Sequence, residues 1–167
     1  PATGHWRPDA LDYLTQSIND MRHNLHQAYL DMQRTTEQLH ASEERLRLAM
    51  QVANEGVWDW SIPDGHVIFN QAFSRMLGYE NDELDPTYTT WESRLHPDDR
   101  ETTLAELQAH LEGKDNDYSV EHRLRTRSGE WMWVLARGAV IERDAQGQPL
   151  RMVGTLKDID ARKRVEQ

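Results

Sequence analysis

Hydrophobic residues return at alternating steps of three and four along the stretch from Leu11 to Ala53, which contains neither proline nor glycine. Two positions of this repeat make one continuous apolar seam. The first seam position is occupied by Leu11, Ile18, Leu25, Met32, Leu39, Leu46 and Ala53, and the second by Leu14, Met21, Ala28, Thr35, Ser42 and Ala49. A spacing of about 3.5 residues held over many turns predicts a long helix that pairs with another helix as a coiled coil.

The seam is not uniform along its length. Its second position turns polar at Thr35 and Ser42, so we expect helix pairing to loosen there. Two interpretations remain open: a helix that shifts when a signal arrives, and a plain dimerisation rod. The charges beside the seam do not fix the direction of pairing. We expect a parallel homodimer, because the domain that follows must sit at the end of each helix.

Past this helix the hydrophobic period shortens to that of strands. Gly56 is expected to end the helix, because glycine is common just after a helix end. Turn residues at Pro63–Gly65 then separate two short strands as a hairpin. The expected elements of this part are strands at 57–62 and 66–69, a helix capped by Asn70 that runs through Leu77, and short helical turns at 81–84 and 90–95.

A stronger helix start follows at His96–Arg100, where proline suits the first helical position and two acids favour the positive end of the helix dipole. One apolar face of this helix is formed by Leu104, Leu107 and Leu111. Strands are expected at 118–126, 130–142 and 150–159, and a further helix follows Asp160. This order predicts an α+β fold: a five-stranded antiparallel sheet with short helices on one face, preceded by the long coiled-coil helix.

The composition narrows the choice of partners. The chain has 167 residues and a net charge of −10, and a field of that sign repels nucleic acid and anionic lipid. The absence of cysteine excludes a disulfide scaffold, a thiolate metal site and a cysteine nucleophile. The longest apolar run, Trp131–Ala136, is far shorter than the about 20 residues of a membrane span. We therefore expect no nucleic-acid partner, no direct membrane contact and no signal peptide in this chain.

Several short motifs stand in a characteristic order. They are Ser42–Ala49, Glu55–Trp60, Asn70, Gly78–Tyr79, His96–Arg100, Glu121–Arg123, Gly129–Val134, Gly154–Thr155 and Asp158–Asp160. In this order they resemble a PAS domain with its C-terminal PAC segment. Upstream, Arg7–Met21 resembles the last helix of a HAMP domain, although any amphipathic helix gives a similar pattern. We accordingly divide the chain into a HAMP-like end and coiled-coil helix at 1–41, a PAS/PAC domain at 42–160, and the start of an outgoing signalling helix at 161–167.

The resemblance implies a cup between the sheet and the short helices. PAS domains hold haem, flavin or a small organic molecule in this cup, or keep it filled with side chains. The pocket-lining candidates are Trp60, Phe69, Phe73, Met76, Leu77, Trp91, Leu104, Leu107, Tyr118, His122, Trp133, Leu135 and Thr155. Each is equally a candidate for ordinary core, and their aromatic bulk is enough to fill the cup without a ligand. A small-molecule ligand therefore stays an open possibility.

The identity of any cofactor also stays open. A flavin photoadduct in this family needs a cysteine, which the chain lacks. The resemblance implies that haem takes an axial histidine from the longer helix, but this helix has Thr102 and Thr103 at the expected place and only His110 near its end. Haem is therefore disfavoured. His23 and His26 make a poor zinc site without further ligands, so no metal site is expected.

The strand at 130–142 is apolar on both faces near its start. We expect Trp131, Trp133 and Leu135 to face the core. The intervening side chains must then be covered by an N-terminal helix or by a dimer partner, which suggests that the dimer involves the domain as well as the coil.

Polar residues on the preceding strand allow two interpretations. His122 is expected to be a hydrogen-bonded pocket residue, and its titration range suits a pH response. Glu121 and Arg123 share the other face of the strand. They form either an exposed cross-strand pair of little energetic value or a polar anchor for a ligand at the pocket edge.

The last strand leads into the outgoing helix through Asp158, Ile159 and Asp160. The resemblance implies a signal-relay hinge here, in which side-chain hydrogen bonds tie the strand to the helix. Asp160 stands where the family usually has a hydroxyl residue. Because aspartate also caps helices, the structural role is retained, but the donor role of a hydroxyl is lost.

Together these features predict a dimeric, cytoplasmic PAS sensory and signal-relay module from a bacterial receptor anchored in the inner membrane. A conformational signal would pass through the coiled-coil helices to a downstream output domain, either a cyclic-di-GMP synthase or phosphodiesterase or a histidine kinase. The alternative is a ligand-free dimerisation and spacer module. A small-molecule-processing enzyme is disfavoured, because the neighbouring acids Asp98 and Asp99 point apart at a helix start, and no catalytic residues are assigned in this chain.

Overall fold

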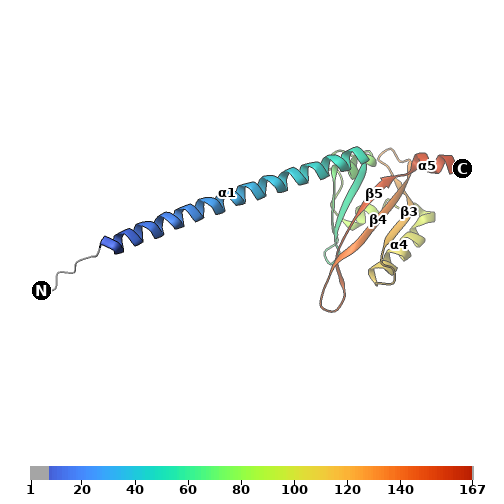
Figure 1. The fold of residues 1–167 in the computed structure, drawn as a ribbon. Helices are drawn as coiled ribbons and strands as arrows, with labels where there is room; N and C mark the ends of the chain where they lie inside the picture. The colour runs from blue at the N-terminus through green and yellow to red at the C-terminus, as the bar shows by residue number, and fades with distance from the viewer. Residues whose placement is uncertain (1–7, 167) are drawn as a thin grey trace. The chain divides into compact units, whose positions relative to one another are not determined.

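The computed structural model describes residues 8–166, and the chain divides into two units (Figure 1). The first unit ends at Leu48 and the second begins at Ala49. We call the second, up to Glu166, the sheet unit. Arg7, the first residue of the HAMP-like stretch, and Gln167 lie outside the described residues. Each unit is described by itself below.

Helix α1 (Pro8–Ala53) confirms the long N-terminal helix and contains 46 residues. Its seam side chains are exposed: 55% of Ile18, 65% of Leu25 and 70% of Met32 is accessible. A helix normally turns its apolar stripe towards a core. The apolar seam of this helix therefore lies uncovered along the chain's own surface.

The predicted end of this helix at Gly56 is wrong. Helix α1 ends at Ala53, and Asn54 adopts a left-handed conformation with φ of +54°. Asparagine tolerates that conformation better than most residues, so it serves as the helix stop. Gly56 instead lies in strand β1 (Glu55–Ser61), where an added Cβ would lie 2.9 Å from Cα of Phe73. Its role is to let a helix approach the strand closely.

The sheet unit contains a five-stranded antiparallel sheet with the order β2-β1-β5-β4-β3, which confirms the predicted fold class. Its other strands are β2 (His66–Phe69), β3 (Tyr118–Arg125), β4 (Trp131–Arg143) and β5 (Pro149–Asp158). Its helices are α2 (Gln71–Met76), α3 (Tyr88–Glu92), α4 (Pro97–Leu111) and α5 (Asp160–Glu166). Figure 1 shows α4 running alongside β3.

Local capping explains where the short helices start. The Asn70 side chain accepts hydrogen bonds from the backbone N–H of Phe73 at 2.9 Å and of Val57 at 2.8 Å, so one side chain caps α2 and ties it to β1. His96 Nδ1 accepts from the N–H of Asp98 at 3.0 Å and caps α4, as its sequence motif predicts. Two other local predictions need correction. Residues 81–84 form a turn without a helix, and α3 begins at Tyr88 after the cap Thr87, rather than at residue 90.

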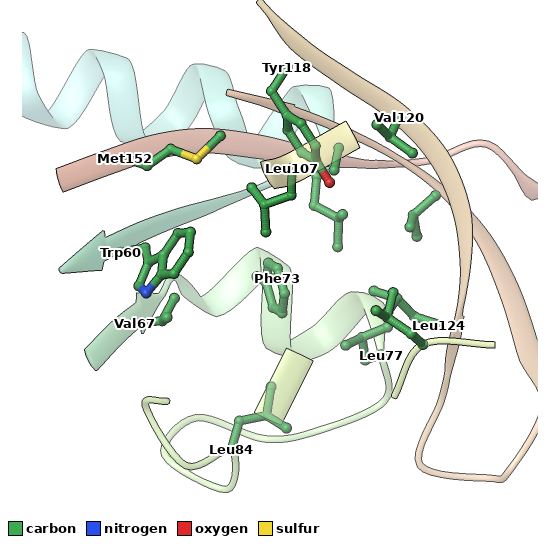
Figure 2. Packing of buried hydrophobic residues seen from close by; sticks show 14 residues of the cluster. Trp60, Val67, Phe73, Leu77, Leu84, Leu107, Tyr118, Val120, Leu124 and Met152 are labelled. Carbon is green, nitrogen blue, oxygen red and sulfur yellow. The ribbon is translucent and has the colours of Figure 1, made fainter. Parts of the chain in front are cut away.

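The core lies against one face of the sheet, here called the inner face. Leu124, Val134 and Met152 are completely buried there, and Phe73 of α2 and Leu107 of α4 pack over them from the helices (Figure 2). Figure 2 also labels Trp60 and Tyr118, which belong to the same buried cluster. The opposite face of the sheet is called the outer face.

The two faces of β4 are reversed relative to the prediction. Val134 and Ala136 are buried on the inner face, whereas Trp131, Trp133 and Leu135 lie on the outer face, with Trp131 41% exposed. The reason is Gly138, which lies two residues beyond Ala136 on the same face. An added Cβ at Gly138 would lie 2.5 Å from the ring of Trp58, so this glycine must face the indole ring.

Candidate functional site

A cavity of about 50 Å³ lies between the inner face of the sheet and helices α2, α3 and α4. Its lining is formed by Trp58, Trp60, Val67, Phe69, Phe73, Tyr88, Trp91, Leu107, Tyr118, Ala136 and Leu156. None of these side chains carries a formal charge at neutral pH. Ligand pockets commonly enclose about 300–1,000 Å³, so this one is small.

The structure gathers part of the predicted pocket around this cavity. The predicted residues that line it are Trp60, Phe69, Phe73, Trp91, Leu107 and Tyr118. The predicted residues that pack nearby without lining it are Met76, Leu77, Leu104 and His122. Trp133, Leu135 and Thr155 are corrections, because the strand register places them on the outer face. Ligand binding by any of these residues stays a prediction.

Trp58 is the largest lining residue that sequence reasoning missed. It lies opposite Gly154 of β5, which in turn pairs with Gly138 of β4. An added Cβ at either glycine would overlap the Trp58 ring. The Trp58 indole N–H donates to the backbone oxygen of Thr155 at 3.1 Å, which fixes the ring. A signal was available in the sequence, because Trp58 and Trp60 are two residues apart on one strand and share a face.

The other lining residues missed were Val67, Tyr88, Ala136 and Leu156. Tyr88 stacks on Trp60, with ring centroids 4.9 Å apart and planes inclined by 19°. Phe69 and Phe73 form a second stacked pair at 4.4 Å. Much of the aromatic surface around the cavity is therefore used for contacts between rings.

Three buried side-chain polar atoms among residues 8–166 lack a hydrogen-bond partner. They are Tyr118 Oη, Trp60 Nε1 and His122 Nδ1. Burial raises the pKa of the Tyr118 hydroxyl well above its usual value, so the hydroxyl stays neutral and keeps its hydrogen. Buried polar groups are normally paired, so these atoms call for an explanation.

His122 lies completely buried behind Trp91, which lines the cavity. The Trp91 indole N–H donates to His122 Nε2 at 3.3 Å, and the rings meet edge to face. Loss of solvation lowers the pKa of His122 to about 4, so the ring is neutral at pH 7 and carries its hydrogen on Nδ1. This histidine holds a wall residue of the cavity in place.

The acids at the start of α4 do not form a catalytic pair. Asp98 is exposed, whereas Asp99 binds Arg123 through both carboxylate oxygens, at 2.8 Å to Nη2 and 2.9 Å to Nε. Hydrogen bonds from Arg123 hold the pKa of Asp99 below its usual value. Glu121 and Arg123 share the outer face as expected, but each pairs with a different residue rather than with the other.

The predicted hinge residues join β5 to α5. Asp158 accepts a hydrogen bond from the N–H of Asp160 at 2.9 Å, and Asp160 accepts from the N–H of Trp133 at 3.0 Å. Ile159 is buried, and its N–H donates to the backbone oxygen of Trp133 at 3.0 Å. Aspartate at position 160 thus acts as an acceptor that bonds directly to β4.

Helix α5 has further contacts with the outer face. Lys163 Nζ lies 4.7 Å from the centroid of the Trp133 ring and 2.6 Å from Glu121 of β3. Arg162 also pairs with Glu121. We call Glu121, Trp133, Asp160, Arg162 and Lys163 the α5 anchor. Arg123 lies over the same Trp133 ring at 4.8 Å, so the Asp99–Arg123 pair connects the start of α4 to this anchor.

The residues present do not fit haem or a flavin adduct. His110 of α4 does not line the cavity, and both of its ring nitrogens are occupied: Nε2 accepts from the N–H of Val140 at 3.1 Å, and Nδ1 lies 3.0 Å from the oxygen of Asp115. The chain has no cysteine, and the cavity volume is far below that of a flavin site. Within residues 8–166, no three potential metal ligands of the His, Cys, Asp and Glu types gather at one place.

None of the helices in the described part of the chain combines the length and the apolar character needed to cross a membrane.

Comparison with solved structures places this arrangement among known folds. The sequence model of the family described as PAS fold matches residues 66–156. A sensory box histidine kinase/response regulator from Burkholderia thailandensis E264 is 43% identical with a TM-score of 0.65, covering 73% of this chain and 89% of that chain. The N-terminal domain of a diguanylate cyclase with PAS/PAC sensor from Marinobacter aquaeolei is 20% identical with a TM-score of 0.57, covering 65% of this chain and 98% of that chain. At that identity the second likeness concerns the fold.

Curated relatives give the same picture at the sequence level. "Probable diguanylate cyclase DgcE" from Escherichia coli (strain K12) is 30% identical over 134 residues, which is 75% of this chain and 11% of that protein. A blue-light-activated histidine kinase from Brucella ovis is 27% identical over 125 residues, which is 75% of this chain and 24% of that protein. The chain therefore spans less than a quarter of the length of either relative.

Proposed function

The chain belongs to the PAS fold family, and from that premise we propose that it is a dimeric sensory and relay module of a bacterial receptor. In this role, the cavity of the sheet unit detects a small molecule, and the helices at its two ends receive and pass on the conformational signal. The single observation that carries the proposal is the uncovered apolar seam of α1. Along the chain this helix is followed directly by strand β1 of the sheet unit.

The seam supports a homodimer, whose helices we propose to be parallel because the sheet unit follows each helix. An isolated helix in water gains little stability from its own hydrogen bonds, so a 46-residue helix with an exposed apolar stripe needs a second helix. The heptad repeat supplies the geometry for a two-stranded coil. Thr35 and Ser42 weaken the second seam position, and a locally weak coil is suited to small changes in helix packing.

The α5 anchor supports an output role for the C-terminal helix. Asp160, Lys163 and Arg162 attach α5 to strands that also form the walls of the cavity. A ligand that moves β3 or β4 therefore changes the contacts of α5. A shift between two helix packings needs only a difference of a few kcal/mol in ligand affinity between the two states.

The full protein is proposed to carry an output domain after this module. Relatives named as a diguanylate cyclase and as histidine kinases support a cyclic-di-GMP enzyme or a kinase in that place. The HAMP-like pattern near the N-terminus supports a membrane-anchored receptor with this module in the cytoplasm. The module itself is proposed to be a non-enzymatic part, since its paired acids bind an arginine rather than a substrate.

A ligand-free dimerisation and spacer module is the second candidate. The observation that favours it is the small volume of the cavity, around which stacked aromatic pairs already fill much of the cup. Native mass spectrometry of the purified chain separates the two candidates. A retained small molecule supports the sensor, whereas a clean dimer that no small molecule stabilises supports the spacer.

The dimer itself is tested by light scattering on the full chain. The expected molar mass is twice the 19.5 kDa of one chain. Leu25→Lys places a charge in the seam and is expected to produce monomers, whereas the matched control Gln27→Lys, at an exposed position outside the seam, leaves the dimer intact. A wild-type mass of one chain at high concentration contradicts the proposal.

The direction of helix pairing is tested by cysteine crosslinking. Only the introduced cysteines can form disulfides, because the chain has no native cysteine. In a parallel coil the same seam residue of each chain lies side by side. Ile18→Cys, far from the middle of α1, is therefore expected to form an intermolecular disulfide, because an antiparallel pair would hold the two Ile18 positions far apart. The off-seam control Asn19→Cys is expected to form little. Equal crosslinking at both positions contradicts a parallel seam.

A further inference from the structure

We propose that the cavity takes a compact, uncharged molecule that carries a hydrogen-bond acceptor, and that the Tyr118 hydroxyl is the donor that recognises it. The inference rests on the proposed sensory function and names the ligand class for that same site. Four features of the described residues carry it: an unpaired hydroxyl, an uncharged lining, a small volume and walls that are fixed by hydrogen bonds.

The unpaired hydroxyl is the main observation. Tyr118 is only 4% exposed, lines the cavity, and has no hydrogen-bond partner for its oxygen. Figure 2 shows this oxygen pointing inwards, among the apolar side chains of the cluster. A buried hydroxyl that has no partner among the protein's own groups is unfavourable unless another molecule supplies one. An acceptor atom on a ligand restores the lost hydrogen bond.

The lining decides the charge of the ligand. No Lys, Arg, Asp or Glu side chain lines the cavity. An ionised ligand would lose its hydration there without gaining an opposite charge. A cation held by aromatic faces is also disfavoured, because two pairs of rings already stack on each other and the unpaired Tyr118 hydroxyl presents a hydrogen-bond donor.

The volume and the walls decide the size. A cavity of about 50 Å³ holds a few waters or a molecule of similar size, since one water needs about 10–15 Å³ by this measure. Two walls are fixed by hydrogen bonds: Trp58 donates to the oxygen of Thr155 and Trp91 donates to His122. Two walls of the cavity are therefore pre-formed, and a ligand much larger than its volume has to displace a lining side chain.

Trp60 leaves a second buried donor unpaired, because its indole N–H has no partner. Figure 2 shows its nitrogen on the side of the ring next to Val67, away from Tyr118. An indole N–H donates and never accepts. Recognition of the ligand's acceptor is therefore assigned to the Tyr118 hydroxyl.

The experiment uses a pair of probes that match in shape. Cyclopentanone carries one carbonyl acceptor and cyclopentane carries none. Thermal unfolding of the full chain is followed while each probe is titrated, because a ligand of the folded state raises the melting temperature. Cyclopentanone is expected to stabilise the wild-type chain at lower concentration than cyclopentane does.

Two matched variants assign the effect to one hydroxyl. Tyr118→Phe removes the unpaired hydroxyl and is expected to weaken cyclopentanone binding about tenfold while leaving cyclopentane binding unchanged. Tyr88→Phe removes a hydroxyl from a half-buried residue of the same lining and is expected to change neither. Tyr118→Phe is expected to fold as well as the wild type, since the hydroxyl it removes has no partner to lose.

Several outcomes overturn the inference. They are equal binding of cyclopentanone by wild type and Tyr118→Phe, stabilisation by tetramethylammonium or propionate in preference to the ketone, and no stabilisation by any probe. Light scattering on the same samples keeps the two proposals apart. A monomer that binds cyclopentanone contradicts the dimeric relay alone, whereas a dimer that binds no probe contradicts the ligand class alone.

Discussion

Helix α1 and the sheet unit differ in the solvent exposure of their leucine side chains. Leu25 of the helix is 65% exposed, whereas Leu124 of β3 is completely buried by the sheet unit's own residues. The sheet unit closes its core within one chain, except at the small cavity beside Tyr118. The helix repeats its apolar residues along a line that its own chain leaves open. The core of the sheet unit is therefore complete within one chain, whereas the seam of α1 is left for the second copy that we propose.

The largest expected effect comes from making the same substitution in both regions. Leu124→Ala is expected to lower the free energy of unfolding of the sheet unit by about 4 kcal/mol, because a fully buried leucine leaves a cavity. Leu25→Ala is expected to leave that unfolding transition unchanged and to weaken dimerisation instead. Chemical denaturation followed by tryptophan fluorescence measures the first effect, and light scattering across a dilution series measures the second. Destabilisation of the sheet unit by Leu25→Ala would remove the distinction between the regions.

The second effect depends on pH and contrasts a buried histidine with an exposed one. The pKa of His122 in the folded state, about 4, lies below its unfolded value near 6.5. Between those two pH values the unfolded chain therefore binds a proton at His122, whereas the folded chain keeps this ring neutral. The free energy of unfolding is expected to fall by about 3 kcal/mol from pH 7 to pH 4 on account of this group, and no such loss occurs above pH 7.

The difference between wild type and His122→Asn isolates this contribution from that of the carboxylates, Asp99 among them. The variant starts less stable at pH 7, because Trp91 loses its acceptor, but it is expected to lose less stability on acidification. His26→Gln, at an exposed position of α1, serves as the control for the loss of a histidine. Parallel profiles for wild type and His122→Asn would show that this ring is not held neutral.

The third effect concerns Gly138 and Gly154, the two glycines that face the Trp58 ring. Gly154→Ala is expected to destabilise the sheet unit by about 2 kcal/mol, because the new methyl group overlaps the Trp58 ring and the backbone oxygen of Arg137. Val153→Ala, at the neighbouring position on the outer face, is the milder control. Denaturation midpoints compare the two. A neutral Gly154→Ala would mean that Trp58 leaves the sheet without cost.

The smallest expected effect concerns the hydrogen bond by which Asp160 joins α5 to β4. Asp160→Ala removes the acceptor for the N–H of Trp133 and is expected to cost about 1 kcal/mol, whereas Asp160→Asn keeps an acceptor oxygen and loses less. A spin label on Val165→Cys, an exposed site in a cysteine-free chain, reports the order of α5. The label is expected to gain mobility in Asp160→Ala and not in Asp160→Asn. Identical spectra for both variants would contradict the role of Asp160 in the α5 anchor.

About half of the predicted pocket residues line the cavity, and the misses have a common cause. The alternation of β4 permits two assignments of its faces, and each buries apolar residues. A shift of one residue in register reverses every side chain of a strand. Trp133, Leu135 and Thr155 were assigned to the inner face for this reason, and Ala136 and Leu156 were overlooked for the same reason.

The sequence by itself determined the long helix with its seam, the order of strands and helices, the caps at Asn70 and His96, and the PAS fold. The helix, the strands and the caps depend on residues that are neighbours along the chain, so local periodicity and capping chemistry are enough to specify them. The PAS fold is predicted by the resemblance of its ordered motifs. Only the tertiary structure decided which face of β4 is buried, that Asp99 binds Arg123, and that the Tyr118 hydroxyl is left unpaired inside a cavity. Each of these depends on residues far apart in the sequence, and their contact follows from strand register and packing.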